Sequence, residues 1–176
     1  MSKFSTAEYH IMVNALAKPG ADILASLTPA DVGSLRDYTN AFCDAGDDLD
    51  LMKKSIIYGK RDLAVLRVGD VSPLESLNLT PAKMHALHMA IGIAGEASEL
   101  LDAVVSHVLY NTPLDEANAI EEMGDLEFYM EGFRQFLLTT REAILKANIA
   151  KLEKRYASLS YSDHQAQARA DKVEAS

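Results

Sequence analysis

The sequence is poor in cysteine, in positive charge and in long apolar runs, and each shortage excludes a class of protein. Cys43 is the only cysteine among 176 residues, so no intrachain disulfide can form and we expect a reducing, cytoplasmic location. No apolar stretch approaches the roughly 18 residues of a membrane-spanning helix. The net charge of −9 argues against binding nucleic acid through its phosphates, which requires a basic surface.

Lysine and arginine are absent from the whole central stretch between Met84 and Phe133. The acidic residues of this stretch are Glu96, Glu99, Asp102, Asp115, Glu116, Glu121, Glu122, Asp125, Glu127 and Glu131. From Arg134 onward the chain is basic by contrast. An acidic segment followed by a basic one favours one part that holds cations and another that holds anions, although a charge run is more often a solvated helix face.

Helix start signals recur along the chain and strand signals are nearly absent, so we predict an all-α fold, a helix bundle with short connections. Ser5-Thr-Ala-Glu8 and Thr139-Thr-Arg-Glu142 have the capping-box pattern. Thr28-Pro29 and Thr80-Pro81 each place a cap residue before a proline. The predicted helices cover about 5–18, 29–58, 80–111, 114–138 and 139–156. The polar composition of 158–176 predicts a loop or a loosely docked tail.

An internal repeat is indicated by Leu27-Thr-Pro-Ala30, which recurs as Leu79-Thr-Pro-Ala82 at an offset of 52 residues. Continued without gaps, this offset gives nine identities over residues 27–58. It also pairs Asp44 with Glu96 and Asp47 with Glu99. We interpret the pattern as a degenerate duplication of a helix hairpin. The alternative is two similar amphipathic helices without common ancestry.

Two pairs of carboxylates stand out. Glu96 and Glu99 lie about one turn apart on one helix face, and Glu122 and Asp125 have the same spacing on the next helix. A short connection makes the two helices antiparallel neighbours, so the four carboxylates face one another. They repel unless protonation or a cation neutralises them. Oxygen ligands alone suit Mg²⁺ or Mn²⁺ rather than zinc, and a spare carboxylate can orient or deprotonate water for attack on phosphorus.

The simplest explanation of a single Glu-x-x-Glu pair is a solvated helix face without a function. Two such pairs on adjacent helices, each flanked by apolar residues, are harder to explain in that way. From the residues alone, the metal site and the solvated faces both stay open.

The acidic motifs also carry a family resemblance. Gly95-Glu-Ala-Ser-Glu99-Leu-Leu-Asp102 followed by Glu121-Glu-Met-Gly-Asp125 resembles the MazG-like nucleoside triphosphate pyrophosphohydrolases, which are all-α. Their fingerprint is Glu-x-x-Glu, a spacer of one to two dozen residues, and Glu-x-x-Asp. His88-Met-Ala-Ile-Gly92 and Asn148-Ile-Ala-Lys151-Leu-Glu-Lys-Arg155-Tyr156 resemble the small members found in bacteriophages. The resemblance covers roughly residues 79–171.

The resemblance implies hydrolysis of a nucleoside triphosphate between its α and β phosphates, which gives a monophosphate and pyrophosphate. It implies Mg²⁺, with Mn²⁺ as a substitute, bound by the catalytic carboxylates Glu96, Glu99, Glu122 and Asp125. Either Glu99 or Glu96 would help to activate the water. A role in the deoxynucleotide pool of the host cytoplasm follows for a phage-encoded member, with a weak preference for a purine such as dGTP or dATP.

The basic helix near the C-terminus is the expected anion site. Asn148, Lys151 and Arg155 lie at i, i+3 and i+7, on one helical stripe, where lysine and arginine can bind phosphate. Ordinary surface charge is the alternative for Lys151 and Arg155. Members of the family are dimers or tetramers, so we also expect a homo-oligomer whose site uses more than one chain.

The segment before residue 79 departs from the family. If it is a duplicate, Asp44 and Asp47 replace Glu96 and Glu99, and a three-residue gap places Arg67 where Glu122 stands. A cation there opposes metal binding, so we predict a non-catalytic structural repeat. The expected segments are therefore a helical repeat at 1–78 packed on the main bundle, MazG-like catalytic helices at 79–157, and a polar tail at 158–176.

The motifs of the sequence also bear on three other functions. A di-iron carboxylate bundle requires Glu-x-x-His motifs, and the chain contains none. A non-catalytic nucleotide-binding or scaffold relative of the same fold is the stronger alternative, although all four acidic positions are present. An HD-type phosphohydrolase is disfavoured because no His-Asp dipeptide occurs.

Overall fold

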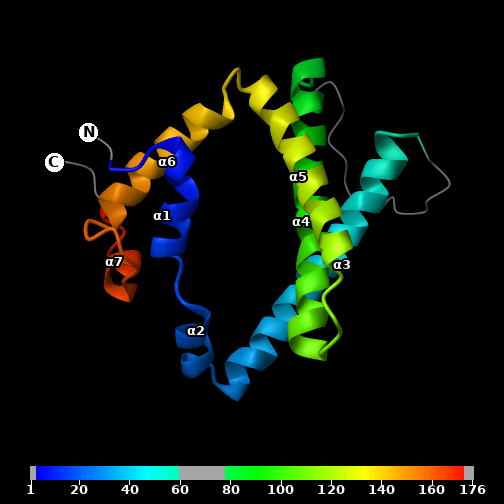
Figure 1. The fold of residues 1–176 in the computed structure, drawn as a ribbon. Coiled ribbons are helices and arrows are strands. Elements are labelled where there is room, and N and C mark those ends of the chain that lie inside the picture. The colour runs from blue at the N-terminus through cyan, green and yellow to red at the C-terminus, as the bar shows by residue number, and fades with distance from the viewer. Residues whose placement is uncertain (1–2, 60–77, 173–176) are drawn as a thin grey trace. The chain divides into compact units, whose positions relative to one another are not determined.

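The computed structural model describes residues 3–59 and 78–172, and this part of the chain contains helices and no strands (Figure 1). The prediction of an all-α fold is therefore confirmed. The α-helices are α1 (Tyr9–Leu16), α2 (Gly20–Ser26), α3 (Pro29–Ile56), α4 (Pro81–Tyr110), α5 (Glu116–Phe136), α6 (Arg141–Arg155) and α7 (Asp163–Ala168). Two 3₁₀-helices, Thr6–Glu8 and Ala170–Lys172, complete the set.

The predicted helix starts are largely those observed. The Thr80 side chain accepts a hydrogen bond from the Lys83 amide at 3.2 Å and caps α4, as its place before a proline predicts. The cap of α6 is Thr140, one residue after the expected Thr139. Helix α2 lies in a stretch for which the sequence predicted no helix.

The chain folds as two compact units. The first comprises Met1–Thr28 with Thr139–Ser176, and the second comprises Pro29–Leu138. This division differs from the expected segments at 1–78 and 79–157, because each of them contributes to both units. Helical periodicity shows that a helix has an apolar face, but it does not show which other helix covers that face.

The first unit has a small core in which Met12 and Leu16 of α1 pack with Ile149 of α6 and with Tyr156. Residues 158–172, expected to be loop or loose tail, are more ordered than predicted, since they include α7 and the second 3₁₀-helix. Asp171 anchors this stretch by accepting a hydrogen bond from Arg155 Nε at 2.6 Å. These short helices were not predicted from the sequence, because they pack through few apolar residues and their composition is polar.

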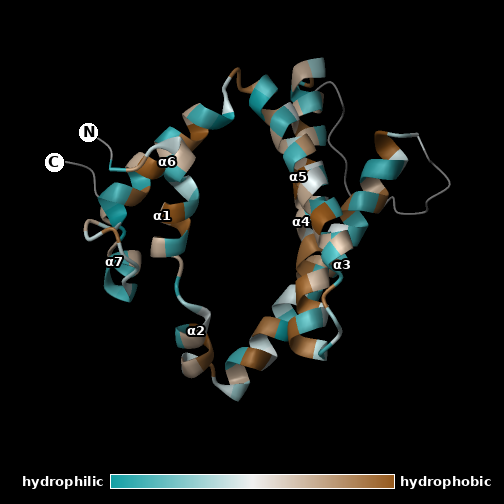
Figure 2. Ribbon diagram, viewed as in Figure 1, coloured by the Kyte–Doolittle hydropathy of each residue, from teal (hydrophilic) through white to brown (hydrophobic). Residues whose placement is uncertain are grey.

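In the second unit, α4 packs against both α3 and α5. Figure 2 shows hydrophobic residues recurring along α4. Glycines permit the close approach to α5: a Cβ on Gly92 would overlap the Tyr129 ring, and a Cβ on Gly132 would overlap Met89. Because these contacts pair early residues of α4 with late residues of α5, the two helices form an antiparallel hairpin. The hairpin predicted from the short connection is thus observed.

The predicted repeat is described only in part. Its first helix is α3, which packs on α4, whereas Arg67 and the remainder of the expected duplicate lie outside the described residues. Among the described helices, none is long and apolar enough to cross a membrane.

Candidate metal centre

Three of the four predicted carboxylates meet where α4 packs on α5. One oxygen each of Glu96, Glu122 and Asp125 lies within 4.8 Å of the other two. Glu96 and Glu122 are buried, with only 7% and 6% of their surface exposed, whereas Asp125 is exposed. The helix hairpin therefore brings together acids from both motifs, with two of them removed from bulk water.

Crowding has a direct effect on Glu122. Burial, followed by the negative charges of Glu99 and Glu96 and a hydrogen bond with Glu96, raises the pKa of Glu122 to about 7. Without a cation, this side chain is therefore partly protonated near neutral pH. A cation that neutralised the cluster would favour the charged form and release this proton.

Glu99 is half-buried and is not a member of the three-carboxylate group. Its pKa is raised by burial and by the charges of Glu96 and Asp50. Glu99 is thus electrostatically coupled to the cluster, but it lies one turn further along α4. Of the predicted four-residue set, it is the one that the structure places apart.

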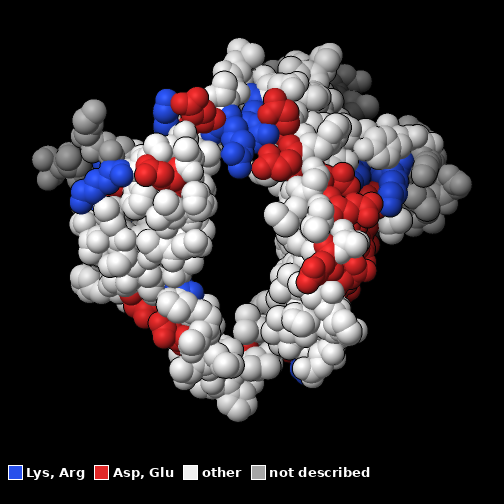
Figure 3. All heavy atoms as spheres, viewed as in Figure 1, with Lys and Arg blue, Asp and Glu red and all other residues white. Residues whose placement is uncertain are grey.

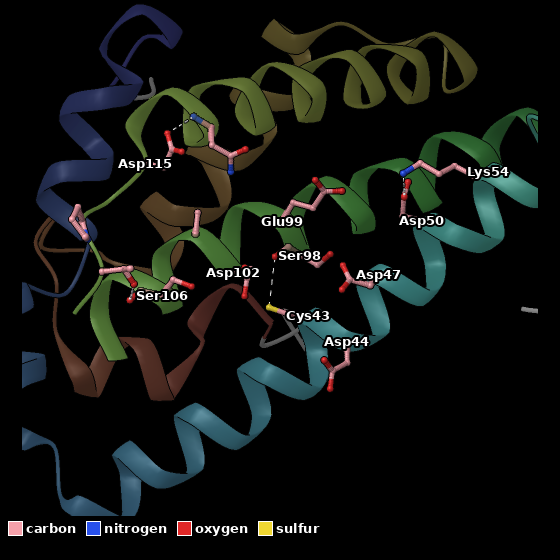
Figure 4. A pocket seen from close by; sticks show the side chains of 14 residues that line it. Cys43, Asp44, Asp47, Asp50, Lys54, Ser98, Glu99, Asp102, Ser106 and Asp115 are labelled. Atoms are coloured by element: carbon pink, nitrogen blue, oxygen red, sulfur yellow. Dashed lines mark hydrogen bonds and ion pairs between the residues drawn. The ribbon is translucent and has the colours of Figure 1, made fainter. Parts of the chain in front are cut away.

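Glu99 lines a pocket of about 640 Å³ between α3, α4 and the connection to α5. The pocket is strongly acidic: its carboxylates are Asp44, Asp47, Asp50, Glu99, Asp102 and Asp115. Figure 4 shows the carboxylates of α3 and α4 along the crossing of these two helices, and Figure 3 shows acidic side chains gathered over this unit. Asp44 and Asp47, the predicted counterparts of Glu96 and Glu99, therefore line a pocket beside the three-carboxylate group.

A lysine that the sequence analysis missed enters the cluster from α3. Lys53 is 4% exposed, and its Nζ lies 3.2 Å from Glu96 Oε1 and 3.0 Å from Asp50 Oδ1. Burial disfavours its charge, but the hydrogen bonds to Asp50 and Glu96 outweigh burial and raise its pKa. The spacing of Asp50 and Lys53 permits an intrahelical pair, but nothing in the sequence indicates Glu96 as the second partner.

Aromatic side chains close the other side of the lysine. Lys53 Nζ lies 5.1 Å from the centre of the Tyr129 ring, within the range of a cation–π contact. The Tyr129 hydroxyl lies 3.3 Å from that of Tyr58, which also lies 3.4 Å from Nε2 of His88. Burial and the hydrogen bond with Tyr58 raise the pKa of Tyr129 to about 12, so it stays neutral.

The predicted anion-binding residues belong to the first unit. The Tyr9 hydroxyl donates a hydrogen bond to Asn148 Oδ1 at 3.0 Å, and Arg155 donates two to Asp171 at 2.6 and 2.8 Å. Lys151 is exposed. Within this unit, Asn148 and Arg155 thus have local structural partners, and their role toward phosphate stays a prediction.

The three oxygens suit a hard divalent cation. In an octahedral shell with a metal–oxygen distance of about 2.1 Å, neighbouring ligand atoms lie about 3 Å apart and opposite ones about 4 Å. Oxygens within 4.8 Å of one another need only a small closure to reach this spacing. The group has no nitrogen or sulfur donor, which favours Mg²⁺ or Mn²⁺.

Comparison with known proteins adds no family: no protein-family model, curated protein or solved structure matches this chain.

Proposed function

We propose that this chain is a divalent-metal-dependent nucleoside triphosphate pyrophosphohydrolase of the MazG-like type. The observation that supports the proposal best is the meeting of Glu96, Glu122 and Asp125 from two adjacent helices, with their oxygens within 4.8 Å of one another. Such a group binds the kind of cation that also binds substrate phosphates. The proposed reaction cleaves the α–β phosphate bond and gives a monophosphate and pyrophosphate.

Each carboxylate has a role in this proposal. Glu96, Glu122 and Asp125 hold the cation, and Glu99 supports it from the next turn. When bound, Mg²⁺ or Mn²⁺ would supply positive charge to the phosphate oxygens and lower the pKa of water. Glu99 or Glu96 orients the attacking water and accepts its proton. The raised pKa of Glu99 makes its carboxylate a stronger proton acceptor.

The substrate and setting follow from the resemblance of the acidic motifs. We propose a deoxynucleoside triphosphate, with a purine such as dGTP or dATP preferred, and action in the cytoplasm on the deoxynucleotide pool. We also propose a homo-oligomer. In the second unit, α5 carries Ile120, Met123 and Phe128 with 58–70% of their surface exposed, which favours association through an apolar face.

Product analysis tests the proposal. Each canonical dNTP and NTP is incubated with the protein and Mg²⁺ or Mn²⁺, and the products are separated by anion-exchange chromatography. Monophosphate together with pyrophosphate, formed only with metal, is the expected result. Diphosphate together with orthophosphate would place the cleavage at another bond and overturn the mechanism.

A third outcome would favour the alternative function. If calorimetry shows metal-dependent nucleotide binding but no product forms from any nucleotide, the chain is a non-catalytic nucleotide-binding or scaffold relative. The same cluster would then hold metal and phosphate without activating water.

A further inference from the structure

Lys53 is a buried cation that contacts the metal centre from a different helix. Its Nζ lies between Glu96 of α4, at 3.2 Å, and Asp50 of its own helix, at 3.0 Å. The side chains of all three residues are largely buried, with 5% of Lys53, 9% of Glu96 and 13% of Asp50 exposed. The ammonium group is therefore shared between one carboxylate inside the three-carboxylate group and one outside it.

Lys53 and a bound divalent cation would compete for the Glu96 carboxylate. A divalent cation bound to Glu96, Glu122 and Asp125 would need the carboxylate that Lys53 already contacts. Two cations at one carboxylate repel, and burial strengthens that repulsion because water screens it weakly. The Tyr129 ring, 5.1 Å from Nζ, borders the ammonium on one side, while Asp50 offers it a second partner.

We propose that Lys53 is the resident counter-ion of the metal centre. It holds Glu96 in place while no metal is bound, and a divalent cation displaces it from Glu96 onto Asp50. This inference rests on the proposed metal-dependent function. It makes Lys53 a positioning residue, since it contacts a metal ligand, and it makes Asp50 the group that receives the displaced charge.

Only one copy of the predicted internal repeat carries this lysine. At the 52-residue offset, Lys53 corresponds to Val105 of α4, which carries no charge. Helix α3 thus contributes an ammonium group that the corresponding position of α4 lacks. The N-terminal repeat would tune the metal centre while its own carboxylates stay outside the three-carboxylate group.

The test is Mn²⁺ binding without nucleotide, measured by titration calorimetry on the full chain. Lys53→Met removes the competing charge and keeps the apolar stem, so we expect tighter binding, with Kd lower by about tenfold. Asp50→Asn removes the alternative partner of Lys53, which Lys54 also contacts, and leaves Lys53 to Glu96, so Kd should rise by about tenfold. Lys83→Met is the control, because it makes the same charge change at the start of α4; its Kd should stay within about twofold of that of the unchanged protein.

The two variants are expected to change the Kd for Mn²⁺ in opposite directions. This distinguishes competition from structural damage, which would weaken binding in both. If Lys53→Met binds Mn²⁺ no more tightly than the unchanged protein, the inference is wrong. If Lys53→Met fails to fold, Asp50→Asn decides the matter, since unchanged or tighter binding there also overturns the inference. If the unchanged protein binds no Mn²⁺, the proposed metal-dependent function fails first and takes this inference with it.

Thermal unfolding supplies an independent readout. Without metal, Lys53→Met leaves Glu96 without its counter-ion and leaves Asp50 paired with Lys54 alone, so its Tm should lie below that of the unchanged protein. Saturating Mn²⁺ should raise the Tm of this variant more than that of the unchanged protein, since it binds more tightly to the folded state. An equal increase in both proteins would contradict the inference.

Discussion

Gly46 of α3 and Ser98 of α4 lie against each other where their helices cross, and they are 52 residues apart in the sequence. A Cβ on Gly46 would overlap the side chain of Ser98. Ser98 is 2% exposed, and its hydroxyl donates a hydrogen bond to the Gly95 carbonyl at 2.7 Å. The helices of the proposed repeat thus cross at equivalent positions, as two copies of one helix do around a twofold axis. The duplication itself stays a prediction.

The close contact at this helix crossing predicts that a larger side chain at position 46 destabilises the folded protein. Gly46→Val should force α3 away from α4 and lower the free energy of unfolding by about 2–3 kcal/mol, the usual cost of overpacking. The measurement is urea unfolding followed by circular dichroism. Gly33→Ala is the matched control, because nothing lies within 4 Å of a Cβ there. It should be neutral or stabilising by up to about 1 kcal/mol, through helix propensity alone.

If Gly46→Val is as stable as the unchanged protein, α3 does not cross α4 at this point. The position of Lys53 beside Glu96 would then also need revision, because the same packing of α3 on α4 creates both contacts.

Removal of one carboxylate from the cluster should separate activity from stability. Glu122→Gln or Asp125→Asn should abolish turnover, because each removes a proposed metal ligand. Helicity should be retained, and the metal-free Tm should be unchanged or higher, since the remaining carboxylates repel less. Steady-state assays, circular dichroism and thermal unfolding check these outcomes.

Glu121→Gln is the control for these variants, since Glu121 is exposed on α5 beside Glu122. It should keep turnover within about twofold, because it changes the net charge equally but lies outside the three-carboxylate group. Full activity of Glu122→Gln would mean that the metal centre is assigned to the wrong residues.

The raised pKa of Glu122 gives the metal-free protein a defined pH dependence. Between the ordinary value of 4.5 and about 7, the folded state binds more protons at this site than the unfolded state. Metal-free stability should therefore fall as pH rises through this window. Added Mg²⁺ should reduce the fall, since it favours the charged carboxylate.

Melting curves at several pH values between 4.5 and 8, with and without Mg²⁺, measure this effect. Glu122→Gln should remove most of the pH dependence that Mg²⁺ suppresses. A profile that is the same in the variant and the unchanged protein would assign the titration to other groups.

The helices and the acidic cluster could be predicted from the sequence, but the packing of α3 could not. Helix starts such as Thr80-Pro81 are local signals, and the hairpin of α4 and α5 follows from its short connection, so Glu96, Glu122 and Asp125 could be placed together. The role of α3 could not be predicted in the same way. Which of its faces meets α4 depends on packing at Gly46 and Ser98, and the burial of Lys53 follows from that packing.

The carboxylates of the N-terminal repeat provide the last prediction. Asp44 and Asp47 correspond to Glu96 and Glu99, but they are exposed and line the acidic pocket outside the three-carboxylate group. The double variant Asp44→Asn, Asp47→Asn should keep kcat and KM within about twofold, because charges in water are screened. Tm should change little for the same reason. Steady-state kinetics at saturating Mg²⁺, with circular dichroism to check folding, make the comparison. A collapse of kcat in a folded variant would show that the N-terminal repeat takes part in the chemistry, and that the pocket between α3 and α4 belongs to the active site.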